Sequence, residues 1–189
     1  MLPAAAAAGV ADEEAAARML VERLGQRVIE ILADDEAALE ARLGALLQSE
    51  FDLPLLARLA LGLEYRRMNA SQKAEYERLF TDLVLKTYSQ RLRAYSGERF
   101  AVLGSSAAGR GAGGDVLVRT EIRRPADTPI RVDWRVRQLE SGPRVIDMVV
   151  EGASFVVTQR SEFLAIAQQH GIDGLLDMLR GRVEAASAT

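Results

Sequence analysis

Few residues in this sequence have a type and spacing suited to chemistry, and the glycine-rich run Gly104–Gly114 is the most conspicuous. A phosphate-binding loop is followed directly by a helix and usually contains a lysine. This run contains no lysine, and the segment after it alternates between apolar and polar residues as a strand does. We therefore interpret it as a flexible hairpin loop.

The single histidine and a pair of aspartates are the other candidates for acid–base chemistry. His170 precedes a glycine at the end of a predicted helix, where an imidazole interacts favourably with the helix C-terminus. Asp133 and Asp147 fall on neighbouring predicted strands and could face each other as a glycosidase-like acid pair. They share their faces with Arg131 and Arg135, so a solvent-exposed ladder of charges is the simpler interpretation. We assign no catalytic residue.

Composition excludes several other classes of function. The chain has 189 residues, 49% of them hydrophobic and 27% charged, which is typical of a globular domain. A net charge of −3 and 5% aromatic residues argue against nucleic acid as a partner. The absence of cysteine excludes disulfides, thiolate nucleophiles and cysteine metal sites, and one histidine is too few for a histidine-rich metal site. We expect no metal and no cofactor.

The first half of the chain has helical periodicity. Leu20, Leu24 and Val28 recur every four residues within a predicted helix over 12–32, and a second helix is predicted over 35–47. Asp52 is a suitable N-cap for a third helix that ends near residue 61. Ser71 is the predicted N-cap of a long fourth helix.

The periodicity changes to two from Phe100 to Val157, which predicts strands with one buried and one wet face. Trp134 belongs to the apolar set of one strand, where it is either a core residue or the wall of an apolar cavity. The breaks between strands are short and rich in turn residues, so we predict an antiparallel meander. Two closing helices are predicted over 161–170 and 172–183.

The ends of the chain differ from the rest in composition. Residues 1–11 are uncharged and rich in alanine, and we interpret them as a residual export signal or linker, with a frayed terminus as the alternative. We expect residues 12–184 to form one α+β domain and residues 185–189 to be a flexible tail.

Three stretches are distinctive enough to compare with known families. They are FDLPLLARLALG at 51–62, VIDMVVEGAS at 145–154 and RSEF at 160–163, and the similarity extends over 79–80, 85–88, 118–122, 130–136 and 171–175. Together they resemble the MlaC, or toluene-tolerance, family of periplasmic phospholipid-binding proteins, over about residues 20 to 183.

The resemblance implies a fold and a function. The expected fold is α+β, with an antiparallel or mixed β-sheet packed against and wrapped by helices and an apolar lipid cavity between them. The expected function is lipid transport in the periplasm, in a system that maintains the lipid asymmetry of the outer membrane. Its expected partners are phospholipid as cargo, an inner-membrane ABC transporter complex with an MCE-type protein, and an outer-membrane lipoprotein–porin complex.

Three alternatives remain beside this expectation. The family includes relatives associated with hopanoid transport, so hopanoid or another lipid is an alternative cargo. The same fold could instead serve as an interaction module without cargo, which predicts a filled core. It could also serve as a small-molecule enzyme, which predicts a polar group with a shifted pKa inside the pocket.

An acyl chain of roughly 16 carbons costs on the order of 12 kcal/mol when it is exposed to water, so a carrier needs a dry cavity. The apolar faces of the predicted helices and strands supply twelve candidate lipid-binding residues. They are Leu55, Leu59, Phe80, Leu83, Val84, Val118, Trp134, Val136, Met148, Val150, Phe155 and Phe163.

Overall fold

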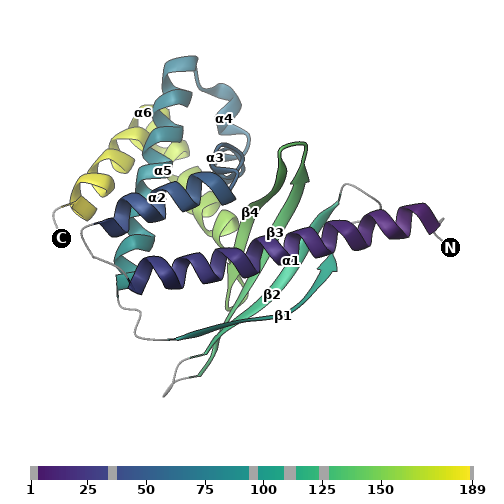
Figure 1. Ribbon diagram of the computed structural model, residues 1–189. Coiled ribbons are helices and arrows are strands. Elements are labelled where there is room, and N and C mark those ends of the chain that lie inside the picture. The colour runs from purple at the N-terminus through teal and green to yellow at the C-terminus, as the bar shows by residue number, and fades with distance from the viewer. Residues whose placement is uncertain (1–3, 34–37, 94–97, 109–113, 124–127, 188–189) are drawn as a thin grey trace.

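The computed structural model describes residues 4–33, 38–93, 98–108, 114–123 and 128–187. It confirms the α+β fold: a five-stranded antiparallel sheet lies beside a group of helices, and one long helix crosses the face of the sheet (Figure 1). The helices are α1 (Ala4–Ala33), α2 (Leu39–Glu50), α3 (Leu53–Leu61), α4 (Glu64–Arg67), α5 (Ala70–Arg93) and α6 (Phe155–Ser187). Among the described helices, none combines the length and the apolar character needed to cross a membrane.

Side-chain caps determine where the central helices begin. The Asp52 carboxylate accepts a hydrogen bond of 3.0 Å from the backbone N–H of Leu55, which confirms Asp52 as the N-cap of α3. The prediction for α5 is wrong by two residues. Asn69, not Ser71, precedes this helix, and the side chains of Asn69 and Gln72 each accept a hydrogen bond from the other's backbone N–H. This reciprocal pair satisfies two donors at the helix start.

The sheet is the predicted meander, with its strands in the order β1-β2-β3-β4-β5 and every neighbouring pair antiparallel. The strands are β1 (Arg99–Ala107), β2 (Asp115–Arg123), β3 (Ile130–Leu139), β4 (Gly142–Val150) and β5 (Ala153–Ser154). The glycine-rich run contributes Gly104 to Ala107 to β1, while residues 109–113 lie outside the described residues.

An irregularity in β4 shifts its pairing with β3. Val145 pairs with Val136 and Asp147 pairs with Arg135, so Ile146 is an extra residue between them. Val145 is consequently fully buried, although a regular strand would place it on the wet face. Asp133 lies opposite Val149 rather than Asp147, so the conceivable acid pair does not form.

The closing helices begin earlier than predicted. Asp147 accepts a hydrogen bond from the backbone N–H of Val156, and Ser154 accepts one from Val157, both at 3.1 Å. These contacts start α6 at Phe155, where the sequence pattern suggested a strand as far as residue 157. The predicted break after His170 is confirmed, because Gly171 has a φ of 72° that divides α6 into two helical segments.

The ends of the described chain are helical. Helix α1 begins at Ala4, within the segment interpreted as a signal remnant or linker, and α6 extends to Ser187, within the expected tail. Residues 1–3 and 188–189 lie outside the described residues.

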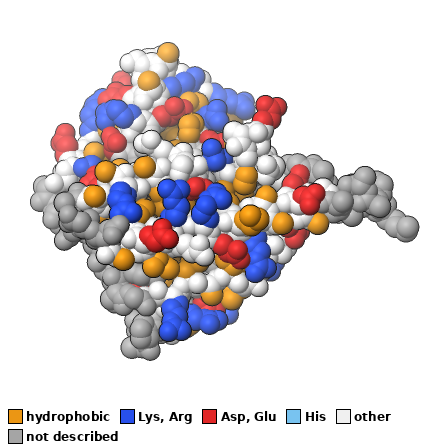
Figure 2. Space-filling view, in the orientation of Figure 1, with side chains coloured by type: hydrophobic (Ala, Val, Ile, Leu, Met, Phe, Trp, Pro, Cys, Tyr) orange, Lys and Arg blue, Asp and Glu red, His pale blue; other side chains and the backbone are white. Residues whose placement is uncertain are grey.

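Two groups of buried apolar residues hold the elements together. The helical core lies among α3, α5 and α6 and contains the aromatic residues Tyr76, Phe80 and Phe163. The sheet core lies where α1 and α2 pack on β2, β3 and β4, and it is mainly aliphatic apart from Trp134. On the face formed by α1 and α2, acidic, basic and hydrophobic side chains are intermixed (Figure 2). Phe51 packs against both cores, which meet along the line where the helices adjoin the sheet.

Candidate functional site

A cavity of about 340 Å³ lies at the junction of the two cores, and we call it the inner cavity. Helices α1, α2, α3 and α5 and strands β2, β3 and β4 all contribute to its wall. The lining side chains are mostly apolar and include Leu24, Val28, Leu43, Leu46, Leu53, Leu56, Val84, Leu85, Tyr88, Leu92, Phe100, Ile122, Val132, Trp134, Met148, Val150 and Phe155. Such a wall favours contact with hydrocarbon over water.

Trp134 faces this cavity with its polar atom already satisfied. Its Nε1–H donates a hydrogen bond of 2.9 Å to the hydroxyl of Thr120, and that hydroxyl donates one of 2.7 Å to the carbonyl oxygen of Val132. Phe51 contacts the indole edge-on, with ring centroids 6.4 Å apart. These contacts fix the orientation of the ring and leave its apolar surface for the cavity.

The close approach of α1 to the sheet forms one end of the inner cavity. Gly25 lies against the ring of Phe100, and a Cβ atom at this position would be 2.3 Å from Phe100 Cδ1. A side chain at position 25 would therefore push α1 away from β1.

Charged side chains join α1 to α2. Arg23 lies 2.9 Å and Arg27 3.5 Å from the carboxylate of Glu50 at the end of α2. Glu50 is buried, whereas both arginines are about half exposed. A buried carboxylate needs such partners, so this cluster makes α1 and α2 one connected wall.

The few polar groups in the lining of the inner cavity are engaged by the protein itself. The Ser89 hydroxyl donates a hydrogen bond of 2.7 Å to the carbonyl oxygen of Leu85. Asp147 accepts hydrogen bonds from the Ser154 hydroxyl and from the backbone N–H groups of Met148 and Val156. Asp147 therefore secures the turn from β4 into α6, and no cluster of three metal-ligating side chains occurs in the described part of the chain.

A second cavity of about 350 Å³ adjoins the first, and we call it the outer cavity. The two cavities share the lining residues Val84, Tyr88, Met148, Val150 and Phe155. The outer cavity differs in its polar lining, which consists of Thr87, Thr158, Gln159 and Arg182. The Arg182 guanidinium is paired with the Glu162 carboxylate, and the hydrogen bond from Arg182 to Glu162 raises the pKa of Arg182.

An apolar inner cavity that adjoins a partly polar outer one is suited to an amphipathic ligand. The sequence matches the family model described as MlaC protein over residues 22–181. The chain belongs to the MlaC family. No curated protein matches the sequence closely enough to count as a relative.

The fold of this MlaC family chain is also similar to that of a solved structure. That structure is described as the phospholipid-binding protein from Ralstonia solanacearum in complex with a phospholipid. The TM-score is 0.79 at 20% sequence identity, and the similarity covers 90% of this chain and 98% of the other. At this identity the comparison supports the α+β fold of the MlaC family chain.

The structure separates the twelve candidate lipid-binding residues into two groups. Six line one or both cavities: Leu83, Val84, Trp134, Met148, Val150 and Phe155. The other six lie outside both linings. Phe80 and Phe163 are fully buried in the helical core, Val118 and Val136 are buried in the sheet core, and Leu55 and Leu59 are partly buried on α3.

Sequence reasoning missed the wall formed by α1 and α2. Leu24, Val28, Leu43 and Leu46 line the inner cavity although none was a candidate. The available signal was the four-residue spacing of Leu24 and Val28, which indicated a buried helix face. Arg182 was missed as well, because its place at the outer cavity depends on the chain reversal at Gly171.

Proposed function

We propose that this MlaC family chain is a periplasmic carrier that binds phospholipid and shuttles it between the two membranes. The observation that supports this most directly is the apolar inner cavity at the junction of the two cores. The solved structure of similar fold is described as a complex with a phospholipid, which agrees with this use of the fold.

The size and polarity of the cavities suit the acyl chains of such a lipid. Ligand sites usually have volumes of roughly 300–1,000 Å³, and the inner and outer cavities measure about 340 and 350 Å³. Each methylene transferred from water into such a site gains about 0.8 kcal/mol, so burial of the chains alone supplies most of the affinity. The carrier then needs only weak contacts with the head group.

The alternative functions are less well supported. An interaction module without cargo requires a filled core, whereas two cavities adjoin here. An enzyme requires a reactive polar group in the pocket, whereas Asp147 and Ser89 of the inner lining are hydrogen-bonded to their own chain. We propose binding without catalysis.

The proposed partners follow from membership of the family. The carrier would receive or deliver phospholipid at an outer-membrane lipoprotein–porin complex and at an inner-membrane ABC transporter with an MCE-type protein. Nucleic acid is not a proposed partner, since the chain has a net charge of −3. Hopanoid is the alternative cargo, and native mass spectrometry of the freshly purified protein distinguishes the two by mass.

The protein contains a single tryptophan, and this tryptophan lines the inner cavity, so it reports on occupation of the site. Phospholipids with brominated acyl chains should quench the fluorescence of Trp134 saturably, because bromine quenches only at contact. The same lipids without bromine are the control for changes in the environment of the indole. Uptake of lipid from vesicles without quenching would place the chains elsewhere, and the absence of any uptake would overturn the proposed function.

A further inference from the structure

The outer cavity is where a lipid held by its chains would present its head group. The outer cavity adjoins the inner one at five shared lining residues, one of which is Tyr88. Apart from Tyr88, the polar side chains of the inner lining are Trp134, Ser89 and Asp147, which are hydrogen-bonded within the chain, and the other polar side chains line only the outer cavity. Besides Tyr88, the side chains that line the outer cavity and can contact a head group are therefore Thr87, Thr158, Gln159 and Arg182.

Arg182 is the only cationic side chain among the described residues that line either cavity. Its side chain is 41% exposed and its partner Glu162 is 37% exposed, so the ion pair is open to solvent. Glu162 lies on the first segment of α6 and Arg182 on the second, and the reversal at Gly171 brings them together. Glu162 does not line the outer cavity. A ligand in this cavity therefore meets the positive guanidinium of Arg182 and not the Glu162 carboxylate.

Three other polar side chains, Thr87, Thr158 and Gln159, line the outer cavity with Arg182. The Thr158 hydroxyl donates to the carbonyl oxygen of Ser154 and is already used. Within the described part of the chain, the Thr87 hydroxyl and the Gln159 amide form no hydrogen bond with another residue. The outer cavity thus combines one guanidinium with two uncommitted donors, which suits an anion with several acceptor oxygens.

We propose that Arg182 binds the phosphate group of the lipid and exchanges Glu162 for the phosphate oxygens on binding. This assignment rests on the proposed function, because it requires the acyl chains to occupy the inner cavity. A guanidinium donates two parallel hydrogen bonds to a phosphate, and the half-exposed Glu162 carboxylate returns to water when it is released. The ligand class is then a diacyl lipid that carries phosphate, in preference to a lipid without phosphate.

The test compares two lipids that differ only in phosphate. Quenching of Trp134 measures the affinity for a brominated phosphatidylethanolamine and for the diacylglycerol with the same brominated chains. Arg182→Gln should weaken binding of the phospholipid by about two- to fivefold, as expected for a partly exposed charged contact, and leave the diacylglycerol unchanged. Glu162→Gln should tighten binding of the phospholipid, because it removes the competing carboxylate.

Arg180→Gln is the matched control. Arg180 lies on the same helix segment with 42% exposure, but its partners are Glu75 and Asp177 and it lines neither cavity. It should leave both affinities unchanged.

Three results would overturn the assignment. The first is an unchanged phospholipid affinity in Arg182→Gln, and the second is an equal loss for both lipids, which would indicate a structural role. The third is Arg182-dependent binding of glycerophosphoethanolamine, which has no acyl chains, as tightly as the intact lipid, because the site would then serve a soluble phosphate compound. A wild-type protein that binds neither lipid would instead contradict the proposed function.

Discussion

The helical core and the sheet core differ in how completely they are filled. In the helical core, Tyr76, Phe80 and Phe163 contact one another with ring centroids 6.1–6.5 Å apart, and Phe163 meets the other two rings nearly at right angles. The sheet core has aliphatic side chains around Trp134, and several of them face the inner cavity at the junction with the edge of the helical core. Interlocked rings contribute roughly 0.5–1.5 kcal/mol per pair beyond their burial, so we infer that the helical core is the rigid frame and the sheet core the adaptable part.

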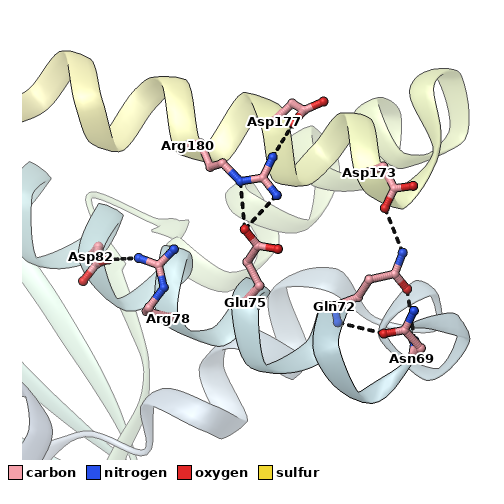
Figure 3. A network of polar contacts seen from close by, with 8 residues as sticks. All are labelled: Asn69, Gln72, Glu75, Arg78, Asp82, Asp173, Asp177 and Arg180. Atoms are coloured by element: carbon pink, nitrogen blue, oxygen red, sulfur yellow. Dashed lines mark hydrogen bonds and ion pairs between the residues drawn. The ribbon is translucent and has the colours of Figure 1, made fainter.

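Polar contacts between residues that line neither cavity strengthen the helical core. The Gln72 amide donates a hydrogen bond of 2.9 Å to Asp173, and Arg180 lies 2.7 Å from Glu75, so α5 is joined to the second segment of α6 at two levels (Figure 3). The wall formed by α1 and α2 is joined within itself through Glu50. We expect ligand entry to move α1 and α2 against the sheet rather than α5 against α6.

The most severe test of this comparison removes a ring from the helical core. Phe163→Ala should lower the free energy of unfolding by about 3–5 kcal/mol, because Phe163 is fully buried among filled contacts. The affinity of the folded protein for lipid should change little, since Phe163 lines neither cavity. Urea unfolding followed by circular dichroism measures the first quantity, and quenching of Trp134 the second.

Met148→Ala is the counterpart on the cavity side. Met148 lines both cavities and is only partly buried, so this change should cost less stability and more lipid affinity than Phe163→Ala. The reverse order of the two effects would show that the helical core, not the sheet core, accommodates the ligand.

A second test adds volume instead of removing it. Val156→Phe should destabilise the protein by about 1–3 kcal/mol, because Val156 is buried in the filled helical core. Val84→Phe should cost less stability, because its side chain borders both cavities and the added ring has empty space to enter. It should also weaken lipid binding by filling space where the two cavities adjoin. Thermal unfolding and lipid binding of the two variants provide the measurements.

Equal destabilisation by the two valine substitutions would contradict the difference in filling. Val84→Phe with normal lipid affinity would show instead that the acyl chains do not pass this position.

The smallest expected effect concerns the charge of Asp115 at the start of β2. Burial alone raises the pKa of Asp115, but hydrogen bonds and charge from Arg137 and Arg135, at 2.7 and 2.6 Å, outweigh it and lower the pKa below its ordinary value of 3.8. The carboxylate therefore stabilises the folded state above pH 3.8, and this contribution is lost as the pH falls through the lowered value. Asp115→Asn should cost about 1 kcal/mol at pH 7, because both arginines are partly exposed.

Unfolding of wild type and Asp115→Asn in urea across pH 2–7 checks the sign. The two stabilities should converge in acid, and a constant difference at every pH would mean that the variant acts through packing rather than charge.

Local signals in the sequence were sufficient for much of the fold. The Asp52 cap of α3 depends on residues three apart, and the alternation in β2 and β3 is a property of each strand alone. The extra residue Ile146 in β4 could not be predicted in this way, because it is defined only by pairing with β3.

The candidate site was harder to predict than the fold for a physical reason. Phe80 and Val84 belong to the same apolar stripe of one helix, yet Phe80 is enclosed by other rings and Val84 borders empty space. Periodicity identifies a buried face but not whether the opposing surface fills it. That distinction depends on residues far away in the sequence, as does the approach of Arg182 to Glu162.

Gly25 has a practical consequence for anyone who seeks to stabilise this protein. An ordinary rule for helices is that alanine in place of an interior glycine gains about 1 kcal/mol. Here the methyl group would collide with the ring of Phe100, so the more helical sequence would hold α1 less closely to the sheet. A library screened for heat resistance should therefore exclude position 25. The close packing of α1 on β1 requires a residue without a side chain there.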